Sequence, residues 1–240
     1  MRTFALLRTA VLVAAFAALT GCLYPEERLV QNGVPPRDAV RQVQEAVDAY
    51  MADRQLLPIK NAGPETPAYE KFIVDFAKLQ RSGYLADIPA AAYERGGPYY
   101  FLVLNEETDP LVRVMNVVVY QQLNDLQDRV DDWREANGGR LPAGEALYPS
   151  FSALDFGQLG GAKPDIRSVF SGRPATVLVH DDGTVYVDYG SDVREAVEKS
   201  GTAPEPDEDL RALLVRESPF VPVKSPVYLW ADGEPAARLP

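Results

Sequence analysis

The chain has 240 residues, of which 46% are hydrophobic and 10% are aromatic. These fractions are typical of a globular protein and exclude an intrinsically disordered one. A net charge of −11 disfavours binding to nucleic acid or to anionic lipid headgroups, because both carry negative charge. One cysteine and one histidine are too few ligands for a zinc site, and the lone cysteine has no partner for a disulfide.

The first residues of the chain have the pattern of an export signal. Two arginines precede an apolar run over residues 10–18, which is too short for a membrane-spanning helix of about 20 residues. The sequence Leu19-Thr20-Gly21-Cys22 resembles the lipobox of bacterial lipoproteins. We therefore predict a lipoprotein signal peptide at 1–21 and a lipid on Cys22 that anchors the chain on the extracytoplasmic face of the cell membrane. An ordinary signal peptide with a chance cysteine is the alternative.

The next segments predict a spacer, a helix and a hairpin. Residues 22–35 contain prolines and no apolar period, so we interpret them as a spacer between the lipid and the fold. Residues 36–54 have helical periodicity, and the predicted buried face consists of Val40, Val43, Val47, Tyr50 and Met51. After a turn-rich loop, residues 99–104 and 111–118 predict two antiparallel strands. We expect the helix to cover them, because a lone hairpin is marginally stable.

The same pattern then starts again. The apolar face of a second predicted helix consists of Leu123, Leu126, Val130 and Trp133. Several residues recur at an offset near 80, namely Gln44, Val47 and Asp48 as Gln127, Val130 and Asp131, and Asp75-Phe76 as Asp155-Phe156. We infer an α+β fold made of two tandem related units, 36–116 and 117–201, each a long helix packed on a small antiparallel sheet. Two unrelated α+β segments are the alternative.

The second unit contains the clearest hairpin of the chain. Residues 177–180 and 185–189 are β-rich runs that flank a turn containing Asp-Gly. Val177 and Val179 fall on one face of the first strand, and Val185, Val187 and Tyr189 fall on one face of the second. A short helix over residues 191–199 is expected to end at Gly201. We interpret residues 202–240 as a linker and C-terminal tail, with one short helix and an edge strand at 227–230, because prolines exclude a central strand.

Several stretches of the chain resemble a known group of proteins. They are Cys22-Leu23-Tyr24-Pro25, Leu57-Pro58-Ile59-Lys60, Thr66-Pro67-Ala68-Tyr69-Glu70-Lys71, Asp75-Phe76, Ile88-Pro89 and Val185-Tyr186-Val187-Asp188-Tyr189. In these stretches the chain is similar to a family of uncharacterised membrane lipoproteins from Bacillus-type Firmicutes. The resemblance implies a monoderm cell surface and brings no catalytic residues, because the family has no established activity. Some relatives carry a transporter-type solute-binding label.

No residue is predicted to be catalytic or to bind a cofactor or metal. His180, the only histidine, is expected on the surface of the second hairpin. No glycine-rich phosphate loop occurs. Strand alternation separates Tyr100 from Tyr99 and Phe101, which favours core packing over a sugar-stacking platform. Neighbouring carboxylates are expected to be solvated, namely Glu106-Glu107, Asp131-Asp132, Asp181-Asp182 and residues 207–209.

The leading hypothesis is a non-enzymatic, lipid-anchored lipoprotein that acts as an interaction or scaffold module at the cell envelope. Its expected partners are the membrane, through the lipid on Cys22, and envelope proteins. The alternatives are a solute-binding lipoprotein of an ABC-type transporter and a cell-wall hydrolase. A deep cleft lined by aromatic and polar groups would favour solute binding, and a buried carboxylate pair in a groove would favour hydrolysis. Convex surfaces without a pocket would favour the interaction module.

Overall fold

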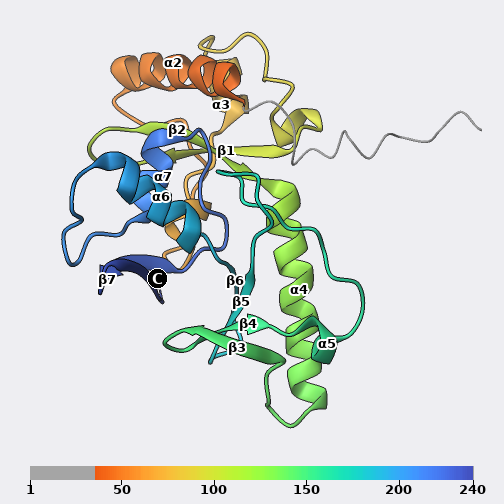
Figure 1. Ribbon diagram of the computed structural model, residues 1–240. Helices are drawn as coiled ribbons and strands as arrows, with labels where there is room; N and C mark the ends of the chain where they lie inside the picture. The colour runs from red at the N-terminus through yellow and green to blue at the C-terminus, as the bar shows by residue number, and fades with distance from the viewer. Residues whose placement is uncertain (1–35, 240) are drawn as a thin grey trace, which may run out of the picture. The chain divides into compact units, whose positions relative to one another are not determined.

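The computed structural model describes residues 36–239, all within one compact unit of residues 34–240. The predicted signal peptide at 1–21, Cys22 and the spacer up to residue 35 lie outside the described residues. The first elements are α2 (Arg37–Arg54), η3 (Ala68–Glu70), α3 (Phe76–Arg81), η4 (Tyr93–Arg95), β1 (Tyr99–Leu104) and β2 (Leu111–Asn116) (Figure 1). The next are α4 (Val117–Ala136), β3 (Ala143–Tyr148), β4 (Phe151–Leu154), α5 (Phe156–Leu159), β5 (Val177–His180) and β6 (Val185–Val187). The last are α6 (Gly190–Ser200), α7 (Arg211–Glu217), β7 (Val227–Ala231) and β8 (Glu234–Arg238).

The fold is mixed α/β with antiparallel sheets, which confirms the predicted class at this level. The strands form three sheets, with the orders β1-β2, β3-β4-β5-β6 and β7-β8. Isolated antiparallel bridges from Ile59 to Val74 and from Ile73 to Leu102 extend the first sheet on the β1 side. The first sheet therefore repeats, in shorter form, the strand order of the second. No helix among residues 36–239 combines the length and the hydrophobicity that a membrane crossing requires.

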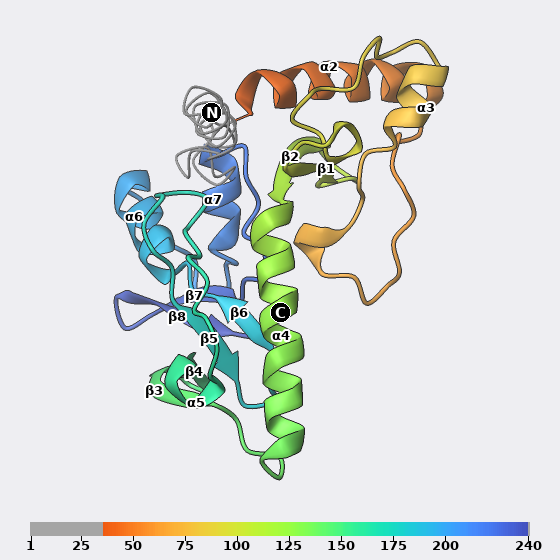
Figure 2. The ribbon, with the colours of Figure 1, turned by 90° about the vertical axis from the view of Figure 1, so that its right-hand side faces the viewer.

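The two long helices bury the faces that their periodicity predicts. Val40, Val43, Val47 and Tyr50 of α2 are buried in a core shared with β1 and β2, whereas Met51, also predicted on this face, is only half-buried. On α4, the residues Leu123, Leu126 and Val130 are buried in a second core that also contains β4, β5 and β6. The helix α4 runs on directly from β2 (Figure 2), so the same backbone connects the two cores.

Two details of the helix prediction are corrected. Val117 and Val118, which were expected in a strand, form the first turn of α4 instead. The reason is that the Asn116 side chain accepts hydrogen bonds from the backbone N–H groups of Val118 and Val119, at 3.0 and 3.2 Å, and so starts the helix. Trp133 is only half-buried, and its indole N–H donates to the Gln158 carbonyl at 3.0 Å.

Gln44 holds α2 to the hairpin β1–β2. Its side-chain Nε2 donates to the Pro110 carbonyl at 2.9 Å, and its Oε1 accepts from the Val112 N–H at 2.6 Å. The same amide donates to the Asp48 carboxylate one turn further along the helix, at 2.8 Å. One side chain therefore satisfies backbone groups on both sides of Leu111, at the start of the second hairpin strand.

Gln127 makes the equivalent contacts between α4 and the hairpin β5–β6. Its Nε2 donates to the Gly183 carbonyl at 3.0 Å and to the Asp131 carboxylate at 3.1 Å. Its Oε1 accepts from the Val185 N–H at 2.8 Å. The acceptor and donor on the hairpin are again two residues apart, so Gln44 and Gln127 have the same role in both halves.

The short helices that follow the long ones also begin in the same way. Asp75 accepts a hydrogen bond from the Lys78 N–H at the start of α3, and Asp155 accepts from the Gly157 N–H at the start of α5. The backbone N–H of Asp75 donates to the Pro58 carbonyl at 2.7 Å, and that of Asp155 donates to the Pro142 carbonyl at 2.8 Å. The recurring Asp-Phe pairs of the sequence are therefore helix N-caps anchored to a recurring proline.

The C-terminal region is part of the core rather than a tail. Segment 218–225 lies along the free edges of both larger sheets: the Val114 N–H of β2 donates to the Pro219 carbonyl, and the Val187 N–H of β6 donates to the Lys224 carbonyl, both at 2.8 Å. Within the strand registers, Val114 and Val187 occupy corresponding positions. This one segment therefore joins the two sheets.

Candidate functional site

His180 does not lie on the surface, which corrects the prediction. It ends β5, an inner strand between β4 and β6, and only 9% of the residue is exposed. Its ring packs against Phe151 with the ring centroids 4.8 Å apart, and its Nδ1 accepts a hydrogen bond from the Asp182 N–H at 3.2 Å. These contacts give His180 a packing role in the second sheet.

The neighbouring carboxylates do not form a facing pair. Asp131 and Asp132 are exposed on α4, and Asp181 and Asp182 are exposed in the β5–β6 turn. Among residues 36–239 no group of three or more His, Cys, Asp or Glu side chains is placed to hold a metal ion. Cys22, the predicted lipidation site, lies outside the described residues.

One carboxylate that sequence reasoning missed organises the second core. Asp188 Oδ1 accepts hydrogen bonds from the Tyr228 hydroxyl at 2.7 Å, the Gly190 N–H at 2.8 Å and the Tyr148 hydroxyl at 3.0 Å. Burial, together with the Asp188 charge, raises the pKa of both tyrosines, so the two hydroxyls stay protonated donors. Gly190 is required here, because a Cβ would lie 2.3 Å from the Tyr148 hydroxyl. This cluster is used for folding.

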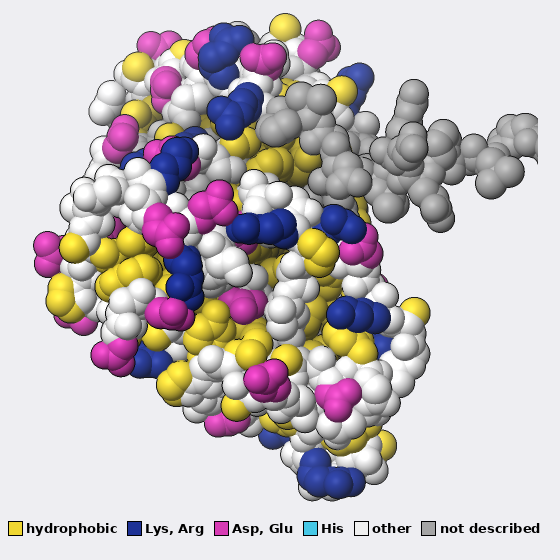
Figure 3. All heavy atoms as spheres, in the orientation of Figure 1, with side chains coloured by type: hydrophobic (Ala, Val, Ile, Leu, Met, Phe, Trp, Pro, Cys, Tyr) yellow, Lys and Arg dark blue, Asp and Glu magenta, His cyan; other side chains and the backbone are white. Residues whose placement is uncertain are grey.

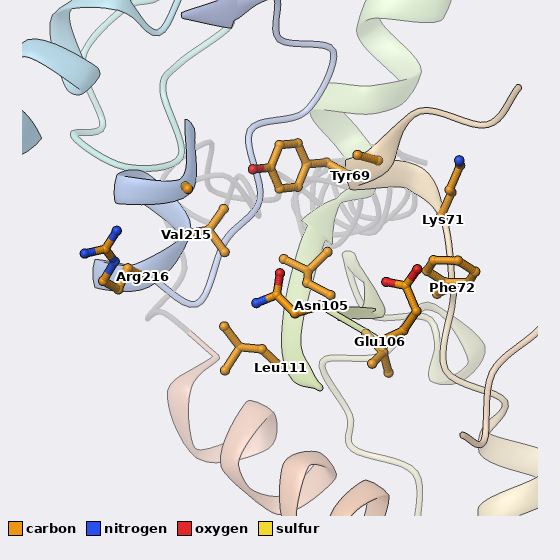
Figure 4. A pocket seen from close by; sticks show the side chains of 12 residues that line it. Tyr69, Lys71, Phe72, Asn105, Glu106, Leu111, Val215 and Arg216 are labelled. Atoms are coloured by element: carbon orange, nitrogen blue, oxygen red, sulfur yellow. The ribbon is translucent and has the colours of Figure 1, made fainter. Parts of the chain in front are cut away.

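A cavity of about 490 Å³ lies between η3, the turn end of the hairpin β1–β2 and α7 (Figure 4). We call it the Tyr69 cleft. Its lining residues are Ala68, Tyr69, Lys71, Phe72, Val103, Leu104, Asn105, Glu106, Leu111, Ala212, Val215 and Arg216. Apolar and polar groups contribute about equally to its lining, and Figure 4 shows the Tyr69 hydroxyl and the Asn105 amide turned toward the space beside Val215 and Leu111. A cavity in which polar groups converge beside apolar side chains is typical of a ligand site.

Tyr69 is held in place from the C-terminal region. The guanidinium of Arg211, at the start of α7, lies 5.0 Å from the centre of the Tyr69 ring. Arg211 is itself fixed by the Asp209 carboxylate at 2.7 Å and by the Ser225 carbonyl at 3.1 Å. Burial is the main cause that raises the pKa of Tyr69, to about 12, with Asp209 adding to it. The Tyr69 hydroxyl is therefore protonated at neutral pH, and it makes no hydrogen bond with another described residue.

Asn105 is positioned by the turn that follows β1. Its backbone adopts a φ of 53°, and its carbonyl accepts from the N–H groups of Thr108 and Asp109 at 3.0 and 3.1 Å. Asparagine is one of the few residues that adopt this left-handed conformation readily. The turn uses the backbone of Asn105 and leaves its side-chain amide without a hydrogen bond to another described residue.

The charged residues of the Tyr69 cleft stand at its sides. Lys71 and Arg216 lie on opposite sides in Figure 4, and the Glu106 carboxylate lies beside Phe72. Lys71 donates to the Pro64 carbonyl at 3.2 Å, and neither Lys71 nor Arg216 has an ion pair within the described residues. On the face in Figure 3, basic, acidic and apolar side chains alternate, without one extended patch of a single charge.

Most of the Tyr69 cleft belongs to the segment 36–116, and this segment matches a known family model. Residues 36–116 match the YphF family N-terminal domain. The match agrees with the predicted resemblance to an uncharacterised Bacillus-type family over this part of the chain. No curated protein and no solved structure matches the chain.

Segment 36–116 differs from the second half at the cleft. By strand register, the positions of Lys71 and Leu104 in the first half correspond to those of Phe151 and His180 in the second half. In the first half these positions line the cleft, whereas in the second half the two aromatic rings at these positions pack against each other.

Sequence reasoning missed the cleft for two reasons. Tyr69 and Asn105 both lie in turn-rich stretches that predicted loops, and α7 comes from the region expected to be a tail. The available signal was the aromatic Tyr69 within a loop of small and polar residues, because an aromatic side chain in such a loop often packs on a neighbouring element.

Proposed function

We propose that this protein is a non-enzymatic binding module of the cell envelope, anchored through a lipid on Cys22 to the extracytoplasmic face of the membrane, and that it binds its partner in the Tyr69 cleft. The observation that carries the proposal is the pair of polar groups in the cleft. The Tyr69 hydroxyl and the Asn105 amide face the cavity and take no part in the hydrogen bonding of the described fold. Polar groups that the fold does not use are available to a ligand.

The chemistry of the cleft supports binding rather than catalysis. A tyrosine with a pKa of about 12 is a poor general base at neutral pH, and the Asn105 amide does not titrate. The histidine is buried in the second sheet, away from the cleft lining. These groups can donate and accept hydrogen bonds in fixed directions, which suits recognition.

We further propose that the two halves are tandem copies of one helix-and-sheet unit, and that the copies have diverged in role. The shared contacts of Gln44 and Gln127, the shared N-caps and the shared strand order support this proposal. We propose that the first copy binds the partner in the Tyr69 cleft. In the second copy Phe151 and His180 pack against each other at the corresponding positions, and this copy has a structural role.

Site-specific photocrosslinking in intact cells tests the proposed function. A photoreactive residue replaces Ala212, an exposed position on α7 that lines the cleft, in the full-length lipidated chain. The matched control places it at Ala77, an exposed position on α3 outside the cleft. We expect a light-dependent protein adduct from position 212 that is absent from position 77 and weaker in the Tyr69→Phe variant. Equal adducts from both positions, or none from 212, would argue against a protein partner in the cleft.

A solute-binding lipoprotein of an ABC-type transporter is the second candidate, and the cavity size favours it. A volume of about 490 Å³ is within the range of small-molecule sites, about 300–1,000 Å³. In that case position 212 gives no protein adduct, and native mass spectrometry of the purified full-length chain detects a small molecule that denaturation releases.

A further inference from the structure

The Tyr69 cleft continues into a second hollow. This hollow has a volume of about 540 Å³ and lies between α2, the start of β2 and the end of α7. The two cavities share the lining residues Leu111 and Arg216. We call the continuous depression the hairpin groove, because it follows the turn end of the hairpin β1–β2. A groove of this extent is longer than the site of a single side chain and can accommodate several residues of an extended chain.

The groove has an excess of unpaired positive charge. Four cations line it without a carboxylate in ion-pair distance among residues 36–239, namely Arg37, Lys71, Arg113 and Arg216. Arg113 donates instead to the carbonyls of Val215 and Val112, at 2.8 and 2.9 Å, and its charge is not neutralised.

Most of the acids in the groove are already engaged. Glu45 pairs with Arg41 at 3.2 Å, Glu217 pairs with Lys199 at 3.0 Å, and Asp48 accepts from Gln44 at 2.8 Å. Asp48, Glu106 and Asp109 are the three groove acids without a cation in ion-pair distance among the described residues, against the four unpaired cations. The unpaired cations therefore outnumber the unpaired acids, although the chain as a whole has a net charge of −11.

We propose that the hairpin groove binds an extended segment of a partner protein in which acidic residues flank an apolar residue. This proposal rests on the proposed function and specifies the chemistry of its ligand. Leu111 and Val215 provide apolar contacts near the point where the two cavities join. The four unpaired cations are distributed over the lining of the two cavities. The Tyr69 hydroxyl and the Asn105 amide are free to bind the peptide backbone. Arginine clusters recognise acidic motifs by charge-assisted hydrogen bonds, and complementary charge selects such a partner over a basic one.

Fluorescence anisotropy with two synthetic probes tests the proposal. The probes are fluorescein-labelled hexapeptides, one alternating glutamate with leucine and the other alternating lysine with leucine. Each is titrated with the full-length lipidated chain in non-ionic detergent, with protein-free micelles as the blank. We expect the acidic probe to bind at least about tenfold more tightly than the basic one, and its affinity to fall as salt rises, because exposed charges are screened.

Charge-removing variants separate the groove from the rest of the surface. Arg216→Gln and Lys71→Gln are each expected to weaken binding of the acidic probe by about two- to fivefold, the effect of an exposed ion pair. Arg95→Gln removes an exposed arginine of η4 that lines neither cavity, and is expected to leave the affinity unchanged. Unchanged far-UV circular dichroism verifies that each variant is folded.

The outcomes distinguish this proposal from the proposed function. If the two probes bind equally, or if Arg216→Gln and Arg95→Gln have the same effect, the acidic ligand class is wrong. A crosslinked partner at position 212 would then still support a protein-binding cleft. If the acidic probe binds selectively and loses affinity with Arg216→Gln and Lys71→Gln alone, the ligand class is supported.

Discussion

Gln127 ties α4 to the β5–β6 hairpin through the same three hydrogen bonds by which Gln44 ties α2 to the β1–β2 hairpin. The two residues are 83 positions apart, yet each amide bridges one carbonyl and one N–H of the hairpin and one aspartate of its own helix. Because the hairpin groups are backbone atoms, the contact survives side-chain divergence on the strands. It is therefore a sensitive test of whether the two halves are built alike.

We predict that Gln127→Ala destabilises the protein by about 1–3 kcal/mol, because the buried N–H of Val185 loses its acceptor. Gln121→Ala is the matched control, since Gln121 is an exposed residue of the same helix without a contact to the hairpin. Urea unfolding measures both variants. The same free energy of unfolding for both would mean that the Gln127 amide does not stabilise the hairpin.

Gln44→Ala is predicted to have an effect of similar size, about 1–3 kcal/mol, because Val112 loses its acceptor in the first half. The two glutamines contact different hairpins and share no partner. In the double variant the two effects should therefore add to within about 0.5 kcal/mol. A strongly non-additive result would contradict the view that each half has its own independent contact.

The long helices α2 and α4 and the first hairpin could be predicted because their signals are local. Val43 and Val47 follow a helical period, and residues 99–104 form a continuous β-rich run. The repeated glutamine was visible in the sequence, but its role was not, because the hairpin partners of Gln44 and Gln127 lie more than 50 residues further along the chain. An identity in sequence does not reveal a non-local hydrogen bond.

The remaining elements depend on tertiary contacts. The strand β3 begins with Ala143-Gly144-Glu145-Ala146, a sequence of low β propensity, and its pairing with β4 is irregular. The strand β8 begins Glu234-Pro235 and was not predicted either. Segment 218–225 is rich in proline, and this composition indicated a tail. Its backbone nevertheless forms hydrogen bonds with the edges of two sheets, and these non-local contacts cannot be predicted from the local sequence. The Tyr69 cleft was missed with these elements, because α7 completes it.

Trp133→Ala is predicted to destabilise the second half by about 2 kcal/mol. This is less than the 3–5 kcal/mol typical of a fully buried tryptophan, because Trp133 is half-buried on α4. Trp133→Phe keeps a ring but loses the hydrogen bond to the Gln158 carbonyl, and about 1 kcal/mol is expected. Chemical unfolding followed by circular dichroism gives both values. A loss of 4 kcal/mol or more with Trp133→Ala would show that the indole is a core residue.

Cys22→Ala is predicted to abolish lipid attachment, because the chain has no other cysteine. Cells grown with an alkyne-tagged fatty acid should label the wild-type protein and the Leu23→Ala control, which keeps the predicted acceptor thiol. The Cys22→Ala variant should stay unlabelled. Normal labelling of Cys22→Ala would refute the lipoprotein assignment. It would not contradict the fold described for residues 36–239, which do not include Cys22.

The stability contributed by Glu70 is predicted to fall as the pH rises. Glu70 follows Tyr69 on η3, and burial raises the pKa of its carboxyl group, against the opposing effect of Lys224, which lies 3.7 Å away. A raised pKa means that the folded state binds this proton more tightly than the unfolded state. The contribution of the Glu70 proton to stability is therefore complete at a pH below the pKa of the unfolded state, about 4.5, and is lost as the pH rises through the pKa of the folded state. Between these two pKa values the loss is about 1.4 kcal/mol per pH unit.

The Glu70→Gln variant reveals this contribution, because glutamine stays neutral at every pH. Its free energy of unfolding, relative to the wild type, should increase as the pH rises from 4 to 8, since only the wild type acquires a buried charge. Glu65→Gln is the matched control, because Glu65 is an exposed residue in the loop that leads to η3. If the difference between Glu70→Gln and the wild type does not vary with pH, or falls as the pH rises, then Lys224 and its neighbours compensate the Glu70 charge fully. The segment 218–225 would then stabilise the wall of the Tyr69 cleft through an ion pair instead of merely tolerating a buried acid.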